Sequence, residues 1–91
     1  MNKIPSNNSQ IKVVLQNTKI MVDDLKGFKV VLLYFSGEKV GKMEYGIVKT
    51  PLQNTQYILT SYKLTPEYME LFNGEENPIQ VLSNYVKTLI V

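Results

Sequence analysis

The sequence predicts a small, mainly β domain, either an antiparallel β-sandwich or a barrel. Three observations lead to this fold class. Hydrophobic residues make up 44% of the 91 residues and charged residues 20%, proportions typical of a folded domain. A chain of this length can bury one modest core but not two. Short runs of β-branched and aromatic residues alternate with turn-forming Asp, Asn, Ser and Gly, which is the pattern of consecutive strands.

The N-terminal third begins with a polar segment. Residues 1–9 are rich in Asn and Ser and are expected to form an extended arm, followed by one β-rich domain over residues 10–91. Residues 10–16 alternate between apolar and polar side chains, which predicts a strand with one buried face. Residues 19–22 form a second short extended piece, and residues 23–27 carry the Asp and Gly of a turn.

A central hairpin is the strongest local pattern. Phe28–Phe35 contains seven apolar residues in eight, so both faces of this strand are expected to be covered, as in the middle of a sheet. A turn over residues 36–39 leads into an antiparallel partner over residues 40–50. The predicted hairpin spans residues 28–49.

One short helix is predicted after a further strand at residues 57–62. Thr65 is suited to the N-cap, because its hydroxyl can accept a hydrogen bond from a free N–H of the first turn. Pro66 is suited to the first helical position, because the N–H that it lacks would have no partner within the helix. Gly74 can end the segment. The expected helix covers about residues 66–72.

The C-terminal segment, residues 79–91, fits two structures. Its apolar residues recur at helical spacing, and Asn77 and Pro78 could begin a helix. Six β-branched residues among these thirteen disfavour a helix and favour a strand. We predict a strand because it fits the β-rich remainder, with a helix as the alternative.

The composition excludes several kinds of chemistry. The chain has no Cys or His, so disulfides, thiolate or imidazole metal sites and His-based triads are excluded. No set of residues points to catalysis, to a cofactor or to a metal, and the protein is not expected to be an enzyme. No apolar run is long enough to cross a membrane, and no signal-peptide pattern opens the chain. A cytoplasmic location is therefore the default expectation.

The charges permit a nucleic-acid partner. The net charge is only +2, but nine of the ten lysines fall within the first 63 residues. Lysines next to tyrosines on strands could bind phosphates while the rings stack on bases. The residues assigned to this alternative function, a small single-stranded nucleic-acid-binding β domain, are Lys12, Lys29, Lys42, Lys49, Tyr45 and Tyr57. The absence of Arg weighs against it, because guanidinium groups are favoured for contacts to phosphates and bases.

Association with other protein subunits, including copies of the chain itself, is the favoured function. Four of the five charged residues after position 63 are glutamates, so the basic and acidic parts of the chain complement each other. An extended arm can pair with an open sheet edge of a neighbour. The residues expected to contact partners are Ile4, Pro5, Leu89, Ile90 and Val91.

The run Asp24-Leu25-Lys26-Gly27-Phe28-Lys29-Val30-Val31-Leu32, followed by Ser36-Gly37-Glu38-Lys39-Val40, resembles the opening hairpin of small β-sandwich modules in bacteriophage virion proteins. This resemblance covers about 17 residues and implies a capsid-decorating, neck or tail component without enzymatic activity, located in the virion. The expected function is therefore a non-catalytic structural or protein-interaction subunit that assembles through strand-edge pairing and apolar contacts.

Overall fold

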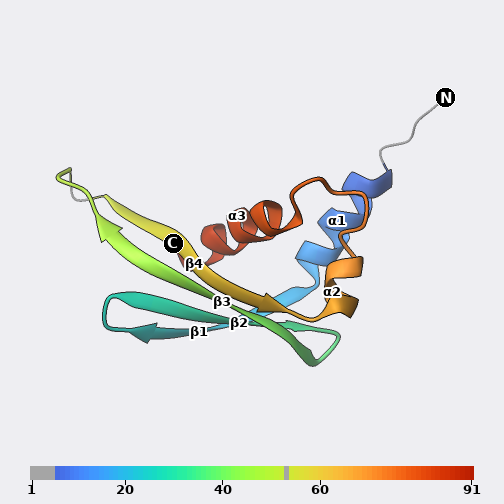
Figure 1. The fold of residues 1–91 in the computed structure, drawn as a ribbon, viewed down its shortest axis with the longest axis horizontal. Helices are drawn as coiled ribbons and strands as arrows, with labels where there is room; N and C mark the ends of the chain where they lie inside the picture. Colours follow the sequence, from blue (N-terminus) through green and yellow to red (C-terminus); the bar gives the residue numbers. More distant parts are fainter. Residues whose placement is uncertain (1–5, 53) are drawn as a thin grey trace.

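The structure, a computed structural model, describes residues 6–52 and 54–91. It is mainly β and contains one four-stranded antiparallel sheet with the strand order β1-β2-β3-β4, flanked by helices (Figure 1). The elements are α1 (Ser6–Gln16), β1 (Thr18–Leu25), β2 (Phe28–Phe35), β3 (Glu38–Lys49), β4 (Thr55–Leu64), α2 (Pro66–Glu70) and α3 (Pro78–Ile90). The mainly β prediction is confirmed, but the sheet is open and does not close into a barrel.

The core lies between the sheet and the helices, which all lie on one side of it (Figure 1). Val31 and Leu33 of β2 and Met43 and Tyr45 of β3 are fully buried on this side. Helices α1 and α3 cover them with buried apolar side chains, which are Ile11, Val14, Leu82, Val86 and Ile90. This burial removes apolar surface from water and is the main force holding the helices on the sheet.

The predicted hairpin over residues 28–49 is confirmed as β2 and β3. Ser36 and Gly37 join the strands with φ angles of 54° and 79°. Two consecutive positive φ angles match a type I′ turn, whose twist suits a two-residue hairpin, and glycine adopts such an angle without steric cost. The register shifts between Leu33 and Tyr34, so β3 carries one extra residue at this point.

The prediction that β2 is covered on both faces is wrong. The strand lies in the interior of the sheet, between β1 and β3. The helices cover only the face that carries Val31 and Leu33, whereas Val30, Leu32 and Tyr34 on the opposite face remain half-buried. The apolar side chains of β2 therefore lie on two different surfaces, one in the core and one open to solvent.

The N-terminal strand prediction is also wrong. Residues 10–16 belong to helix α1, and residues 6–9 begin the same helix rather than an extended arm, while residues 1–5 lie outside the described residues. Ile11 and Val14 are three positions apart and both reach the core. The helix ends where the Thr18 hydroxyl donates to the Val14 carbonyl at 2.7 Å. The burial of Ile11 and Val14 favours a helix over residues 10–16, although the alternation of polar and apolar residues had favoured a strand.

Residues 79–90 belong to helix α3, so the strand prediction for residues 79–91 is wrong and the helix alternative is correct. Asn77 occupies the N-cap and Pro78 the first helical position. Leu82, Val86 and Ile90 lie four positions apart and are all buried. The burial of this stripe outweighs the modest helix penalty of the β-branched residues.

The short helix predicted at residues 66–72 is present as α2, which ends at Glu70 and is followed by turns. The Thr65 hydroxyl accepts a hydrogen bond from the backbone N–H of Tyr68 at 3.2 Å, as an N-cap does. The Tyr68 ring is buried and packs edge-on against Phe72, with their centroids 5.3 Å apart. Its hydroxyl lies 2.7 Å from Thr18 Oγ1, so α2 is tied to the junction of α1 and β1.

Candidate functional site

The sheet face turned away from the helices, here called the outer face, is the candidate functional surface. Successive side chains of a strand point to opposite faces, so Val30, Leu32 and Tyr34 lie on this face because Val31 and Leu33 lie in the core. The strand registers extend the face across the sheet. Its rows are Lys19–Tyr34–Lys39, Met21–Leu32–Lys42–Lys63, Asp23–Val30–Glu44–Ser61 and Leu25–Phe28–Gly46–Ile58.

One part of the outer face is apolar. Leu25 is 48% exposed, Phe28 38% and Ile58 49%. Register pairing places Leu25, Phe28 and Ile58 in one row, with Gly46 between the last two. Extensive exposed apolar surface marks contacts with other molecules, and this row is the candidate for such a contact on the outer face.

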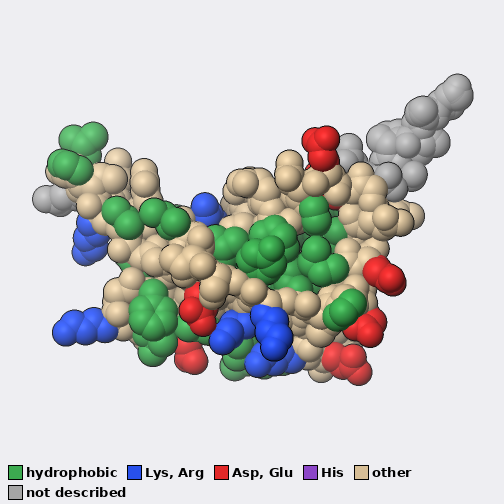
Figure 2. Space-filling view, viewed as in Figure 1, with side chains coloured by type: hydrophobic (Ala, Val, Ile, Leu, Met, Phe, Trp, Pro, Cys, Tyr) green, Lys and Arg blue, Asp and Glu red, His purple; other side chains and the backbone are tan. Residues whose placement is uncertain are grey.

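The other part of the outer face is basic. Tyr34 on β2 lies directly opposite Lys19 on one side and Lys39 on the other. Lys42 and Lys63 are opposite each other in the next row. Lysine side chains gather over the strands on the side of the molecule away from the helices (Figure 2). Because like charges repel, this half of the face favours an anionic partner.

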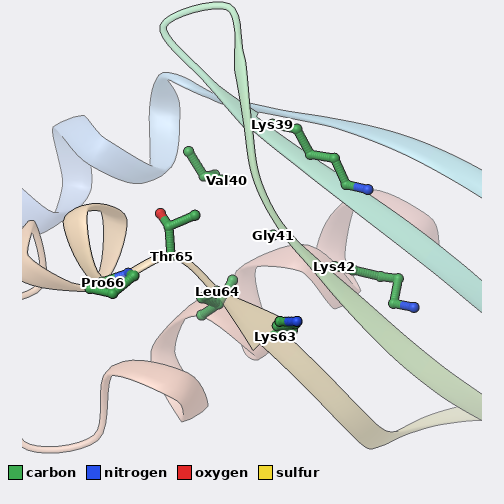
Figure 3. Close-up of a pocket in the computed structure, with 8 residues that line it drawn as sticks. All are labelled: Lys39, Val40, Gly41, Lys42, Lys63, Leu64, Thr65 and Pro66. Carbon is green, nitrogen blue, oxygen red and sulfur yellow. The ribbon is translucent and has the colours of Figure 1, made fainter.

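A shallow hollow of about 410 Å³ adjoins the basic rows and lies between β3 and the end of β4. Lys39, Lys42 and Lys63 contribute to its lining (Figure 3), and Leu64 and Pro66 supply apolar walls. Lys39 and Lys42 extend to one side of β3, whereas Val40 points toward the helices (Figure 3). The hollow thus combines ammonium groups with apolar surface and can hold a carboxylate or phosphate beside an aliphatic group.

One lysine of the basic rows, Lys42, is paired with a carboxylate. The Lys42 ammonium lies 3.3 Å from a carboxylate oxygen of Glu44, which stands in the neighbouring row of β3. Both side chains are partly exposed, so this ion pair is weak and easily exchanged for another anion.

Buried hydroxyl groups on the helix side hold the fold together. The Tyr45 hydroxyl lies 3.1 Å from Ser83 Oγ of α3, joining the middle of the sheet to the helix. Burial raises the pKa of Tyr45, partly offset by the hydrogen bond with Ser83. Burial likewise raises the pKa of Tyr68, partly offset by its hydrogen bond with Thr18. Both groups are neutral at physiological pH and act as structural contacts between elements.

The residues assigned to the nucleic-acid alternative are not brought together. Tyr45 is buried, and so its ring offers no surface for a base. Lys29 lies on the helix side, where its ammonium is 2.6 Å from Asp24 and 5.6 Å from the centre of the Tyr57 ring. The pair with Asp24 is the leading cause of the raised pKa of Lys29. Of the six residues, Lys42 alone lies in the basic rows of the outer face; Lys12 is on α1 and Lys49 at the far end of β3.

The residues expected to contact partners have different environments. Ile4 and Pro5 lie outside the described residues. Ile90 is buried against the sheet and belongs to the core, whereas Leu89 and Val91 are exposed at the end of α3.

The basic rows around Tyr34 were not predicted from the sequence. Lys19, Lys39 and Lys63 are far apart in the chain, and only the strand register places them beside Tyr34 and Lys42. One signal was present in the predicted hairpin, because a turn over residues 36–39 brings Lys39 near the end of the strand that carries Tyr34.

No metal site or membrane-spanning helix is found in the part of the chain that the structure describes. Among residues 6–52 and 54–91, no group of three or more Asp and Glu side chains is arranged to hold a metal ion. None of the helices in these ranges is both long and apolar enough to span a bilayer.

Comparisons of the chain with protein-family models, with curated proteins and with solved structures gave no match.

Proposed function

We propose that the protein is a non-catalytic structural or protein-interaction subunit whose outer face binds another protein and whose strand edges support assembly. The observation that carries this proposal is the apolar row Leu25–Phe28–Ile58 on an open sheet face. Leaving these side chains in water is unfavourable, and covering them contributes about 25 cal/mol per Å² of apolar surface.

The chemistry of the outer face indicates the kind of protein that binds there. The apolar row suits aliphatic or aromatic side chains, and the rows with Lys39, Lys42 and Lys63 suit carboxylates. The partner is therefore an acidic protein surface with exposed apolar residues. Bound in this way, it would cover the face of the sheet that the helices leave open.

A virion is the proposed setting for this assembly. The support is the resemblance of the segment from Asp24 to Val40 to hairpins of bacteriophage virion modules. In the fold this segment includes β2 and both of its turns, and it contributes to the outer face.

Co-purification of matched variants tests the proposal. The double variant Phe28→Glu/Ile58→Glu places carboxylates in the apolar row, and Val13→Glu adds one to an exposed position on α1. After purification from the native source, the wild type and Val13→Glu should retain the same protein partner at constant stoichiometry. The outer-face variant should lose it while keeping its circular dichroism spectrum. Retention of the partner by all three proteins would contradict the proposal.

Single-stranded nucleic acid is a second candidate partner, favoured by one observation. Tyr34 lies between Lys19 and Lys39, with Lys42 and Lys63 in the next row, so one aromatic residue has four lysines at nearby positions of the sheet. The other aromatic residue of the face, Phe28, lies three rows away from Tyr34 with aliphatic residues between them, and the chain has no Arg. A protein partner therefore fits the whole face better.

Titration of labelled single-stranded DNA at several salt concentrations tests the second candidate. The variant Lys39→Gln/Lys63→Gln removes two charges from the outer face, and Lys12→Gln/Lys49→Gln removes two from elsewhere. If nucleic acid binds the outer face, the first variant should lower the salt slope by about 1.4, at roughly 0.7 for each phosphate that is no longer neutralised, and the second should not. Equal reductions in both variants would indicate unspecific attraction to the net charge.

A further inference from the structure

Strand β1 forms one free edge of the sheet and is more regular than the other edge, β4. It pairs with β2 over all eight residues from Thr18 to Leu25 without a register shift. In β4 the register shifts and leaves Thr60 as an extra residue, whose hydroxyl donates to the Glu44 carbonyl. A bulge interrupts edge pairing, whereas an unbroken edge offers a complete row of backbone donors and acceptors to another strand.

The side chains of β1 are complementary to those of a second copy of β1. A two-fold axis perpendicular to the sheet pairs identical strands antiparallel and keeps the helices of both copies on one side. Opposite residues then share a face. With the axis at Met21, Lys19 lies opposite Asp23 of the second copy, Ile20 lies opposite Val22, and both pairs occur twice.

Neighbouring registers lack this complementarity. With the axis at Val22, Ile20 would lie opposite Asp24 and Met21 opposite Asp23, so each carboxylate would face an apolar group. With the axis at Ile20, Lys19 would lie opposite Met21. The register centred on Met21 is the one that pairs Lys with Asp and apolar with apolar side chains.

The side chains of β1 that would contact a second copy are accessible and are not occupied by other ion pairs in the described part of the chain. Met21 is 61% exposed and Val22 38%. Asp24 is already paired with Lys29 on the helix side. In the described part of the chain, Lys19 and Asp23 form no ion pair within the molecule.

We propose that two copies of this chain associate through β1, antiparallel about a two-fold axis at Met21, and form one continuous eight-stranded sheet. The inference rests on the proposed assembly role, since it names a second copy as a partner and β1 as its binding edge. In the dimer, the outer faces of the two copies join into one larger surface.

Charge reversal tests the register. Lys19→Asp or Asp23→Lys alone converts both Lys–Asp pairs into like-charge pairs and should raise the dimer dissociation constant about tenfold or more. The double variant Lys19→Asp/Asp23→Lys restores both pairs with opposite polarity and should dimerise within about threefold of the wild type. Sedimentation equilibrium at several concentrations measures these constants. A double variant as weak as the single ones, or a wild type that stays monomeric at about 100 μM, would overturn the proposal.

Disulfide cross-linking tests the position of the axis, and the absence of Cys from the chain makes single-cysteine variants unambiguous. Met21→Cys places two thiols directly opposite each other, and mild oxidation should give a covalent dimer. Leu25→Cys is the control, because the two copies of residue 25 would lie about 27 Å apart. Cross-linking of Leu25→Cys as fast as Met21→Cys, or none of Met21→Cys, would refute this register. Partner binding is tested separately by the variants on β2 and β4, so failure of the dimer leaves that test intact.

Discussion

Two glycines of β3, Gly41 and Gly46, differ in the space beside them, and their alanine variants should differ in stability. A methyl group at Gly41 would overlap Leu64 Cδ2 and lie 2.5 Å from the backbone carbonyl oxygen of Lys63. A carbon and a carbonyl oxygen normally approach no closer than about 3.3 Å, and a backbone oxygen cannot rotate away. Gly41→Ala therefore requires β4 to move from β3 by most of an ångström.

The magnitude follows from two opposing effects. Overpacking of a well-packed region costs about 1–3 kcal/mol. Replacing glycine by alanine in a strand returns about 0.5–1 kcal/mol, because the unfolded chain loses conformational freedom. We expect Gly41→Ala to lower the free energy of unfolding by about 1–2 kcal/mol. At Gly46, a methyl group would lie 3.5 Å from Thr60 Cγ2, an ordinary contact, so Gly46→Ala should be neutral or slightly stabilising.

Urea unfolding followed by circular dichroism measures both variants. The difference between them, about 2 kcal/mol, corresponds to melting temperatures about 8 °C or more apart in a domain of this size. The m-values should remain equal, since the surface exposed on unfolding does not change. Equal stability of the two variants would refute the close approach of β3 and β4 at Gly41.

Three other perturbations have expected outcomes. The raised pKa values of Tyr45 and Tyr68 mean that the unfolded state ionises first, so their contribution to stability should be fully present below about pH 9 and be lost as the pH rises above about pH 10. Replacing both by Phe should flatten this alkaline fall in pH-dependent melting curves. Thr65→Ala removes the N-cap of α2 and should cost about 1 kcal/mol in urea unfolding, with Thr65→Ser recovering most of it. Leu33→Ala leaves a cavity in the core and should cost about 2–5 kcal/mol; a cost below about 1 kcal/mol would contradict its full burial.

The sequence was sufficient to predict the elements whose signals are local. The β2–β3 hairpin follows from its apolar run and from a turn that needs positive φ angles at Ser36 and Gly37. Helix α2 follows from Thr65 and Pro66, which fix its first turn. In both segments the residues that decide the structure are neighbours in the chain.

The turn predicted at residues 23–27 is confined to Lys26 and Gly27, because residues 23–25 continue strand β1. The wrong strand predictions for α1 and α3 have one physical cause. In α1 and α3, β-branched residues and partial alternation favoured strands, but tertiary burial of Ile11, Val14, Leu82 and Val86 on the sheet favours helices. The sequence does not reveal which segment covers the sheet. For the same reason, the number of covered faces of β2 could not be derived from its composition.

The candidate surface could be predicted only in part. The sequence indicated that lysines and tyrosines share strands, and one lysine of the predicted set, Lys42, lies in the basic rows of the outer face. It could not separate Tyr45, which is buried, from Tyr34, which lies among lysines, because both occur in apolar strands. That difference depends on whether the odd-numbered or the even-numbered residues of each strand point toward the helices.

The loop end of the β3–β4 hairpin projects beyond α3 as an overhanging arm (Figure 1). Its loop is closed by a hydrogen bond from the Thr50 N–H to the Asn54 carbonyl, and Leu52 beside it is largely exposed. Without a helix beneath it, the arm depends on strand pairing alone and should open locally before the rest of the sheet does. Small rotations at its root become larger displacements at its tip, so we expect the tip to move more than the packed core does.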